Sequence, residues 1–402
     1  MGEPAQRTDR CGAAPRVRRV CCIRHSIYPE EATHRREVEA LFRAGCETHV
    51  ICLARDGGTW SSETVHGVFV HRLPLRRKRG SIMRYVFDYA VFALCAGVHV
   101  TFLHLKHRFD VIQVNTMPDF LVFAAAIPKL LGAKIVLGMQ EPVPELWEAK
   151  FGSAPPGILK VVEQWALAYA DVSFTVTEQL KSRFVQRGAR GERISVVLNV
   201  PDHATLKVNG HPVPERVGET FTLMSHGTIE ERYGFDTLLE AVALLRERIP
   251  GLRVRIMGEG TYVPRLLERR KRLGLEPWVE HLGWVSWSEV LKELRGADVG
   301  VVAVKSSPYA DLVHTGKMYE FMAASIPVIA SRLTAVEAYF DERAITYFEP
   351  DKPASLADAI LRIHRDPARR AAQVESATRL YTSYSWEKQQ GIYLSNFRRF
   401  WS

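Results

Sequence analysis

Short apolar runs rich in β-branched residues alternate with amphipathic segments along most of the chain. The runs at 18–23, 48–53, 68–73, 111–115, 134–137, 172–176 and 194–198 are typical of strands buried on both faces of a parallel sheet. Between them lie helical patterns such as 35–44, where Val38, Leu41 and Phe42 share one face and Gly45 ends the segment. This alternation predicts a mostly parallel sheet covered by helices on both faces.

A change of composition after residue 200 predicts a boundary between two such domains. Residues 201–219 contain three prolines and two glycines, which is typical of a linker. The alternation then restarts with strands at 221–225, 253–257, 299–304 and 327–330 and helices at 235–248 and 317–324, and Ser286 with Glu289 forms a capping box. We predict a flexible tail (1–15), a doubly wound α/β domain (16–203), a linker (204–219), a second doubly wound domain (220–382) and a last helix (383–402). Each ligand should lie beyond the carboxyl ends of the strands, facing the cleft between the domains.

Composition narrows the function only slightly. The chain has 402 residues, 47% of them hydrophobic, and a net charge of +9, which suits nucleic acid, an anionic membrane or a phosphorylated substrate. Nucleic acid is disfavoured because no aromatic stacking platform or groove-reading helix accompanies the basic residues. The six cysteines form no C-x-x-C motif and are interpreted as reduced thiols. Because the first fifteen residues lack the apolar core of a secretory signal, we expect a cytoplasmic protein.

The segment 85–105 is apolar and long enough to span a membrane, and the basic run 75–80 precedes it. Asp88, His99 and His104 would be costly in hydrocarbon, and the strand that follows at once would be separated from its sheet. We therefore expect a buried or interface-lying helix. The basic run would allow peripheral contact with the inner face of a membrane.

The first candidate phosphate site is Gly258-Glu259-Gly260, which follows a strand and precedes a helix. Glycines there let backbone amides approach a phosphate. The third glycine of a dinucleotide fingerprint is missing, so a simple tight turn is the alternative interpretation.

The second candidate is the start of the helix after His314-Thr315-Gly316. Free N–H groups and the helix dipole would face the cleft there, and Lys317 adds a charge suited to phosphate oxygens. Glu320, one turn further on, could accept both hydroxyls of a ribose. The alternative is an amphipathic helix with Lys317 and Glu320 merely solvated.

An ordered set of motifs carries a family resemblance over roughly residues 16–400. In the second half these are Ser225–Thr228, Glu231–Gly234, Gly258–Gly260, Leu273–Leu275, His281–Val285, Ala297–Val299 and the block 317–330; in the first half they are Gln113–Asp119 and Pro144–Trp147. Together they resemble the retaining GT-B glycosyltransferases of family 4, also called glycosyl transferases group 1.

The resemblance implies two Rossmann-like domains facing across a cleft, with a GDP- or UDP-sugar in the second, an acceptor in the first and a terminal helix that crosses back to the first. It implies catalytic roles for Arg232, Lys317 and Glu320. Donor contacts are expected from Gly227, Thr228, Gly258, Glu259, Gly260, Val285, His314, Thr315 and Gly316, and acceptor contacts from His25, Arg35, Asn115, Gln140 and Glu141.

The chain departs from the family pattern at several positions. The first of the family's two usual glutamates falls at Leu312, and its diphosphate-binding Arg and Lys fall at Thr228 and Tyr233. We interpret Arg232 and Lys317 as the diphosphate clamp instead. The family's histidine near the reacting sugar is replaced by Gln140, which cannot exchange a proton at neutral pH.

The resulting hypothesis is a retaining transferase that moves a sugar to a small-molecule acceptor, with specialised-metabolite biosynthesis as one setting. Same-face substitution needs no protein nucleophile, and because no Asp-x-Asp occurs we expect neither a metal nor another cofactor. The acceptor atom is oxygen or sulfur. The alternatives are a transferase acting on a lipid-linked glycan precursor at the membrane, a non-catalytic glycosyltransferase-like partner and a nucleotide-sugar epimerase.

Overall fold

The computed structural model describes residues 17–55, 58–75, 82–154, 156–202 and 220–401. The predicted tail (1–15), nearly all of the basic run (75–80) and the predicted linker (204–219) lie outside the described residues.

The first sheet has the strand order β3-β4-β2-β1-β5-β6-β7-β8. All neighbouring strands are parallel except β3 and β4, which form an antiparallel edge. The strands are β1 (Arg19–Ile23), β2 (Glu47–Leu53), β3 (Ser61–Val65), β4 (Val68–Leu73), β5 (Val111–Asn115), β6 (Lys134–Met139), β7 (Val172–Thr175) and β8 (Ile194–Val196). The helices are α1 (Ala32–Arg43), α2 (Ile82–His107), α3 (Ala126–Leu130), α4 (Val143–Phe151), α5 (Gly157–Tyr169) and α6 (Glu178–Gln186), with short 3-10 turns η2 (Asp119–Ala125) and η3 (Gly191–Arg193). Strand order reverses between β1 and β5, which is where ligands of such sheets bind.

The second sheet is wholly parallel, with the order β11-β10-β9-β12-β13-β14. Its strands are β9 (Phe221–His226), β10 (Leu252–Met257), β11 (Val279–His281), β12 (Val299–Val302), β13 (Val328–Ser331) and β14 (Ile345–Phe348). Around it lie η4 (Glu231–Tyr233), α8 (Phe235–Leu245), α9 (Val263–Arg272), α10 (Trp287–Arg295), α11 (Lys317–Ala323), α12 (Thr334–Glu337) and α13 (Pro353–Arg365). The prediction of two doubly wound α/β domains is thereby confirmed.

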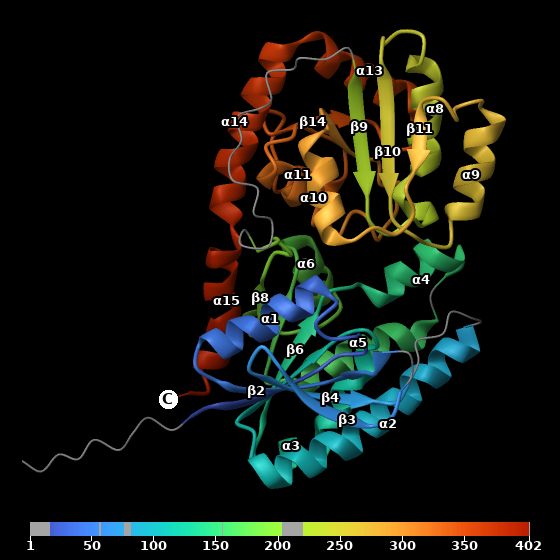
Figure 1. Ribbon diagram of the computed structural model, residues 1–402. Coiled ribbons are helices and arrows are strands. Elements are labelled where there is room, and N and C mark those ends of the chain that lie inside the picture. The colour runs from blue at the N-terminus through green and yellow to red at the C-terminus, as the bar shows by residue number, and fades with distance from the viewer. Residues whose placement is uncertain (1–16, 56–57, 76–81, 155, 203–219, 402) are drawn as a thin grey trace, which may run out of the picture.

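Two final helices connect the domains along one side (Figure 1). α14 (Pro367–Tyr384) packs on α11 of the second domain, and α15 (Trp386–Arg398) packs on α1, β7 and β8 of the first. Trp386, Tyr393 and Phe397 of α15 are buried in the core of the first domain. The chain therefore returns to its first domain after completing the second.

Observed and expected elements differ mainly where the local pattern is weak. β3 is a polar edge strand whose side chains are nearly all exposed, so it has no apolar signature. β11 and β14, of three and four residues, were also not predicted from the sequence. The N-cap half of the predicted capping box is present, since the Ser286 side chain accepts a hydrogen bond from the Glu289 amide.

The apolar segment forms α2, which is buried along one face only. Phe92, Ala96 and Val100 lie in the core of the first domain, whereas Phe87, Leu94 and Val98 are exposed. Within the part of the chain that the structure describes, α2 alone is long and apolar enough to cross a membrane by length and composition.

Candidate active site in the cleft between the domains

A cavity of about 680 Å³ lies between the two domains. The first domain contributes the start of α1 and the segment 199–202, and the second contributes the carboxyl ends of β9 and β10, the loop around 284–287 and the start of α11. Ten of the predicted site residues line it, namely Arg35, Gly227, Thr228, Gly258, Glu259, Val285, Thr315, Gly316, Lys317 and Glu320. Most of the predicted donor-site residues therefore line a single cavity.

Lys317 reaches the cavity because the residue opposite it has no side chain. Gly227 has φ +104°, and a Cβ atom there would lie 2.3 Å from Lys317 Cε. The ammonium also lies 4.5 Å from the centre of the Tyr233 ring, and a cation over an aromatic face is attracted to it. Only glycine at 227 leaves both the backbone conformation and the lysine stem undisturbed.

Glu320 lies between cations from both domains. Its Oε2 atom is 3.3 Å from His226 Nε2, and its side chain is 21% exposed. Burial raises the pKa of Glu320, while Lys317 and Arg36 act in the opposite direction. Burial, reinforced by Lys317, lowers the pKa of His226 to about 3, so His226 is neutral at pH 7. Glu320 thus presents its carboxyl group to the cavity beside a neutral His226.

Arg36 is a site residue that sequence reasoning passed over in favour of Arg35. Its Nη2 donates to Asn199 Oδ1 at 2.8 Å, and its guanidinium lies 4.6 Å from the centre of the Trp386 ring. Burial lowers its pKa to about 10. Arg35, by contrast, is partly exposed and lies 3.9 Å from Glu39. The two arginines are adjacent in sequence, so only helix orientation could have distinguished them.

Arg232 does not line this cavity, in contrast to Lys317. Its guanidinium lies 4.8 Å from the Tyr233 ring centre and 5.9 Å from that of Tyr309. Tyr309 donates to Glu141 at 2.7 Å. Burial raises the pKa of Glu141, and Tyr309 and Arg232 act in the opposite direction. The Tyr233 ring therefore contacts both cations, although only Lys317 lines the cavity.

His314 and Gly260 also lie outside the cavity lining. His314 Nε2 is 2.8 Å from Tyr319 Oη, and burial lowers its pKa to about 4. A Cβ atom on Gly260 would lie 1.9 Å from the Ile229 carbonyl oxygen. Both positions support the loops that carry the site.

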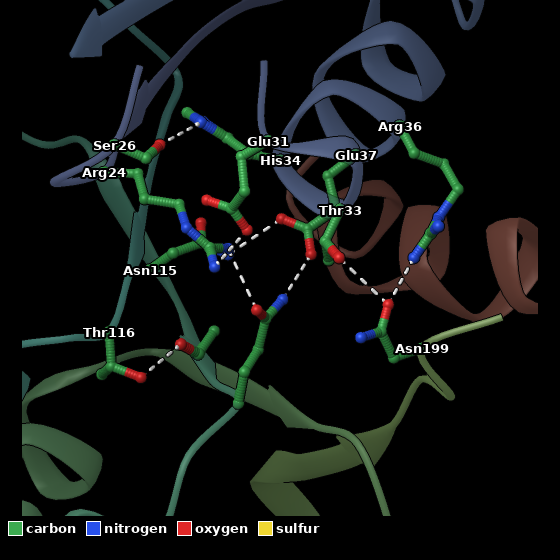
Figure 2. A network of polar contacts seen from close by, with 12 residues as sticks. Arg24, Ser26, Glu31, Thr33, His34, Arg36, Glu37, Asn115, Thr116 and Asn199 are labelled. Atoms are coloured by element: carbon green, nitrogen blue, oxygen red, sulfur yellow. Dashed lines mark hydrogen bonds and ion pairs between the residues drawn. The ribbon is translucent and has the colours of Figure 1, made fainter. Parts of the chain in front are cut away.

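The acceptor side is a closed hydrogen-bond network centred on Glu37 (Figure 2). Glu37 accepts from Gln113 Nε2 and Asn115 Nδ2, both at 2.8 Å, and from Gln140 Nε2 at 2.7 Å. The other end of the Gln140 amide accepts from Arg24 Nη1 at 3.0 Å. The side-chain amides of Gln140 and Asn115 are therefore already hydrogen-bonded within the protein.

Glu37, at the centre of this network, was not among the residues predicted from the sequence. It is 3% exposed, and burial raises its pKa. One signal was present, because Glu37 follows His34 and precedes Leu41 on the apolar face of α1. A carboxylate on a core-facing stripe must find hydrogen-bond donors.

His25, the remaining predicted acceptor residue, packs against α2. Its ring centre is 4.9 Å from that of Tyr89 and 4.8 Å from that of Phe92, both edge to face. It follows β1, so it lies at the carboxyl edge of the first sheet next to the apolar helix.

Three possible metal ligands gather away from the cleft. Glu47, His49 and His107 bring one ligand atom each within 4.8 Å of one another. Glu47 already accepts from Arg19 Nε at 3.3 Å, and His49 Nδ1 is 3.0 Å from His71 Nε2. Since Arg19 places a positive charge beside Glu47, this group fits an ion pair between Glu47 and Arg19 better than a cation site.

Known proteins of the same build are numerous. A sucrose-phosphate synthase from Thermosynechococcus elongatus aligns over 95% of this chain and 98% of its own, with a TM-score of 0.77 at 17% identity. Anabaena Alr3699/HepE, solved in complex with UDP-glucose, covers 95% and 99% with a TM-score of 0.71 at 16% identity. The two domains facing across a cleft are the GT-B architecture.

Sequence comparisons give the family. The model of the glycosyl transferases group 1 matches residues 220–366, and that of the glycosyl transferase 4-like domain matches residues 31–199. The D-inositol 3-phosphate glycosyltransferase of Arthrobacter sp. is 29% identical over 182 residues, which are 44% of this chain and 42% of the relative. A glycogen synthase of Mycobacterium tuberculosis is 24% identical over 229 residues, 56% of this chain and 53% of the relative. The chain belongs to the group 1 (family 4) GT-B glycosyltransferases, although it aligns with only about half the length of these curated relatives.

Proposed function

We propose that this protein transfers a sugar from a nucleotide-diphosphate sugar held in the cavity between the domains. The observation that carries the proposal is the arrangement at the start of α11, where Lys317 crosses Gly227 and Glu320 follows one turn later. The Anabaena neighbour was solved with UDP-glucose, which makes UDP-sugars the first donors to test.

The proposed chemistry relies on fixed charge. When the sugar–phosphate bond breaks, negative charge grows on the diphosphate, and Lys317 with the free amides of the α11 N-terminus would stabilise it. Glu320 would accept hydrogen bonds from donor hydroxyls. Because Lys317 and these amides can stabilise the diphosphate without a metal ion, we propose that transfer is independent of metal.

On the acceptor side we propose same-face substitution with retention. Gln140 cannot take a proton at neutral pH, and its amide is already held by Glu37 and Arg24. The departing phosphate oxygen would therefore take the acceptor proton as the acceptor atom bonds to the anomeric carbon.

As expected from the sequence, we propose a small-molecule acceptor, with specialised-metabolite biosynthesis as one setting. A lipid-linked acceptor is the second candidate, favoured by the exposed apolar face of α2 next to His25.

The test is a calorimetric titration with UDP, GDP, ADP and TDP, followed by hydrolysis of the matching sugar donor with and without EDTA. We expect one nucleotide to bind, to stabilise the fold by about 2.7 kcal/mol at one hundred times its dissociation constant, and its sugar to be released at the same rate in EDTA. Binding of no nucleotide would contradict the proposal. Binding without any release or transfer of sugar would indicate the non-catalytic partner instead.

A further inference from the structure

The outer face of α2 is an uninterrupted apolar stripe. The small exposed Ala90 fills the gap between Phe87 and Leu94, and the large side chains of the stripe are each more than half exposed: Met83, Val86, Phe87, Leu94, Val98, Phe102 and Leu105. Soluble proteins rarely leave so many large apolar side chains exposed along one helix. In Figure 1 α2 lies along the side of the first domain that is turned away from the second.

Neighbouring helices enlarge this apolar face. α2 packs against η2 and α3, and Gly97 lies close to Ala124, where its Cβ atom would be 3.5 Å from the Ala124 Cα. α3 exposes Leu130, which is followed by Leu131, and α5, which packs on η2, exposes Ile158 and Trp165. Apolar side chains are therefore also exposed on the helices that lie next to α2 and η2.

The connections of α2 prevent it from spanning a bilayer. β4, before it, and β5, after it, belong to the same sheet, and β5 pairs with the central strand β1. Phe92 and Val100 on the opposite face of α2 are fully buried in that domain. The helix can lie along a membrane surface but cannot cross it while this sheet remains intact.

The charges around the apolar face are mainly positive. Lys106 and Arg108 at the end of α2, and Lys150 near its start, are exposed, and the Lys150 ammonium lies 4.4 Å from the Tyr85 ring centre. The acidic residue of α2, Asp88, is paired with Arg84 at 3.0 Å. Two copies of this face would bring like charges together, whereas anionic lipid headgroups would neutralise them.

We propose that the exposed face of α2 docks on the surface of an anionic lipid bilayer. The apolar stripe would enter the interface, and Lys106, Arg108 and Lys150 would contact lipid phosphates. His25, at the acceptor side of the cleft, packs against Tyr89 and Phe92 of this helix, so docking would bring that side close to the membrane.

The experiment is vesicle flotation of the full-length protein without any substrate, so its outcome is independent of the proposed transferase activity. Vesicles of phosphatidylcholine are compared with vesicles containing about 30% phosphatidylglycerol. The variant is Phe87→Glu with Val98→Glu, at positions that are 61% and 67% exposed. The matched control is Val185→Glu with Leu244→Glu, which are 42% and 50% exposed on α6 and α8.

We expect the wild type and the control to bind anionic vesicles and to bind neutral vesicles at least about tenfold more weakly. The α2 variant should lose at least about tenfold in binding to anionic vesicles while keeping the wild-type melting temperature. Failure of the wild type to bind, or equal loss in both double variants, would overturn the proposal. So would a stable dimer that the α2 variant dissociates, because the face would then cover a second copy of the chain.

Discussion

Glu320 of the second domain is a half-buried carboxylate and Glu37 of the first is a fully buried one, and burial raises the pKa of each. Their partners differ. Glu37 accepts hydrogen bonds from three side-chain amides, whereas Glu320 lies beside a neutral His226 and lines the cavity. Glu320 has acceptor capacity left for a ligand, and that of Glu37 is used to hold Gln113, Asn115 and Gln140.

This contrast extends to the two halves of the cleft. In the second domain, glycines leave space in front of Lys317, and charges face that space. In the first domain, α1, β5 and β6 are tied together, and Tyr393 of α15 donates to Gln113 as well. We infer that the second half binds and activates the donor, while the first half is a rigid frame against which the acceptor is positioned.

Lys317→Met should have the largest effect on activity. Losing the one lysine at the start of α11 would remove stabilisation of the leaving diphosphate, so kcat should fall about 10²- to 10³-fold. Affinity for a nucleoside monophosphate should change much less than affinity for the diphosphate. Lys292→Met, on the exposed surface of α10, is the control and should retain wild-type kinetics. A loss of less than about threefold would mean that Lys317 is only a surface charge.

Glu320→Gln should weaken donor binding about tenfold or more, because a hydrogen bond to a charged acceptor contributes about 1.5–3 kcal/mol.

The same substitution should raise the stability of the ligand-free fold rather than lower it. The folded-state pKa of Glu320 lies above its usual 4.5, so the unfolded chain loses this proton first and the wild type loses stability as pH rises from 4.5 to the folded-state pKa. The neutral amide is free of that cost, so the Tm of the ligand-free Glu320→Gln variant should rise relative to that of the wild type as the pH increases from 4.5 to the folded-state pKa. A constant Tm difference across that range would contradict this assignment.

Glu37→Gln should show the reverse pattern, with loss of stability and little loss of donor affinity. The new amide would direct its own N–H groups at Gln113, Asn115 or Gln140, leaving buried donors unpaired at a cost of about 1–3 kcal/mol. Denaturant unfolding measures this, with Glu39→Gln on the same helix as the control. Glu39 is partly exposed in a surface ion pair, so its change should cost less than about 0.5 kcal/mol. Equal stability of the two variants would show that the network is not a rigid frame.

The residues of the second domain that line the cavity could be predicted because each is recognisable from its neighbours in the sequence. Gly227, Gly258 and Lys317 each sit directly after a strand or at the start of a helix, and parallel topology brings such positions to one edge. Arg232 does not line the cavity with Lys317, although both side chains contact the Tyr233 ring. Backbone position could be predicted there, but side-chain direction could not.

The acceptor half depends on contacts between residues far apart in the chain. Glu37 meets Asn115 and Gln140 only after α1 packs against β5 and β6, and Arg36 meets Trp386 only after α15 returns to the first domain. The α2 segment illustrates a second limit. Its length and hydropathy were plain, but only the fold distinguishes the face that packs in the core from the one left exposed.

Gln140→His should have the smallest effect and still tests the comparison of the two halves. The Gln140 amide both donates to Glu37 and accepts from Arg24. Histidine is shorter and cannot reach both partners with the same geometry, so one hydrogen bond should be lost, at about 0.5–1.5 kcal/mol. Donor hydrolysis should not change. Turnover with the native acceptor should not rise, because the proposed same-face mechanism passes the proton to the leaving phosphate. The measurement is turnover of both forms with hydroxyl and thiol acceptors in parallel. A large gain in turnover for the variant would show that position 140 acts chemically rather than as part of the frame, and that the site had lost a proton-transferring histidine.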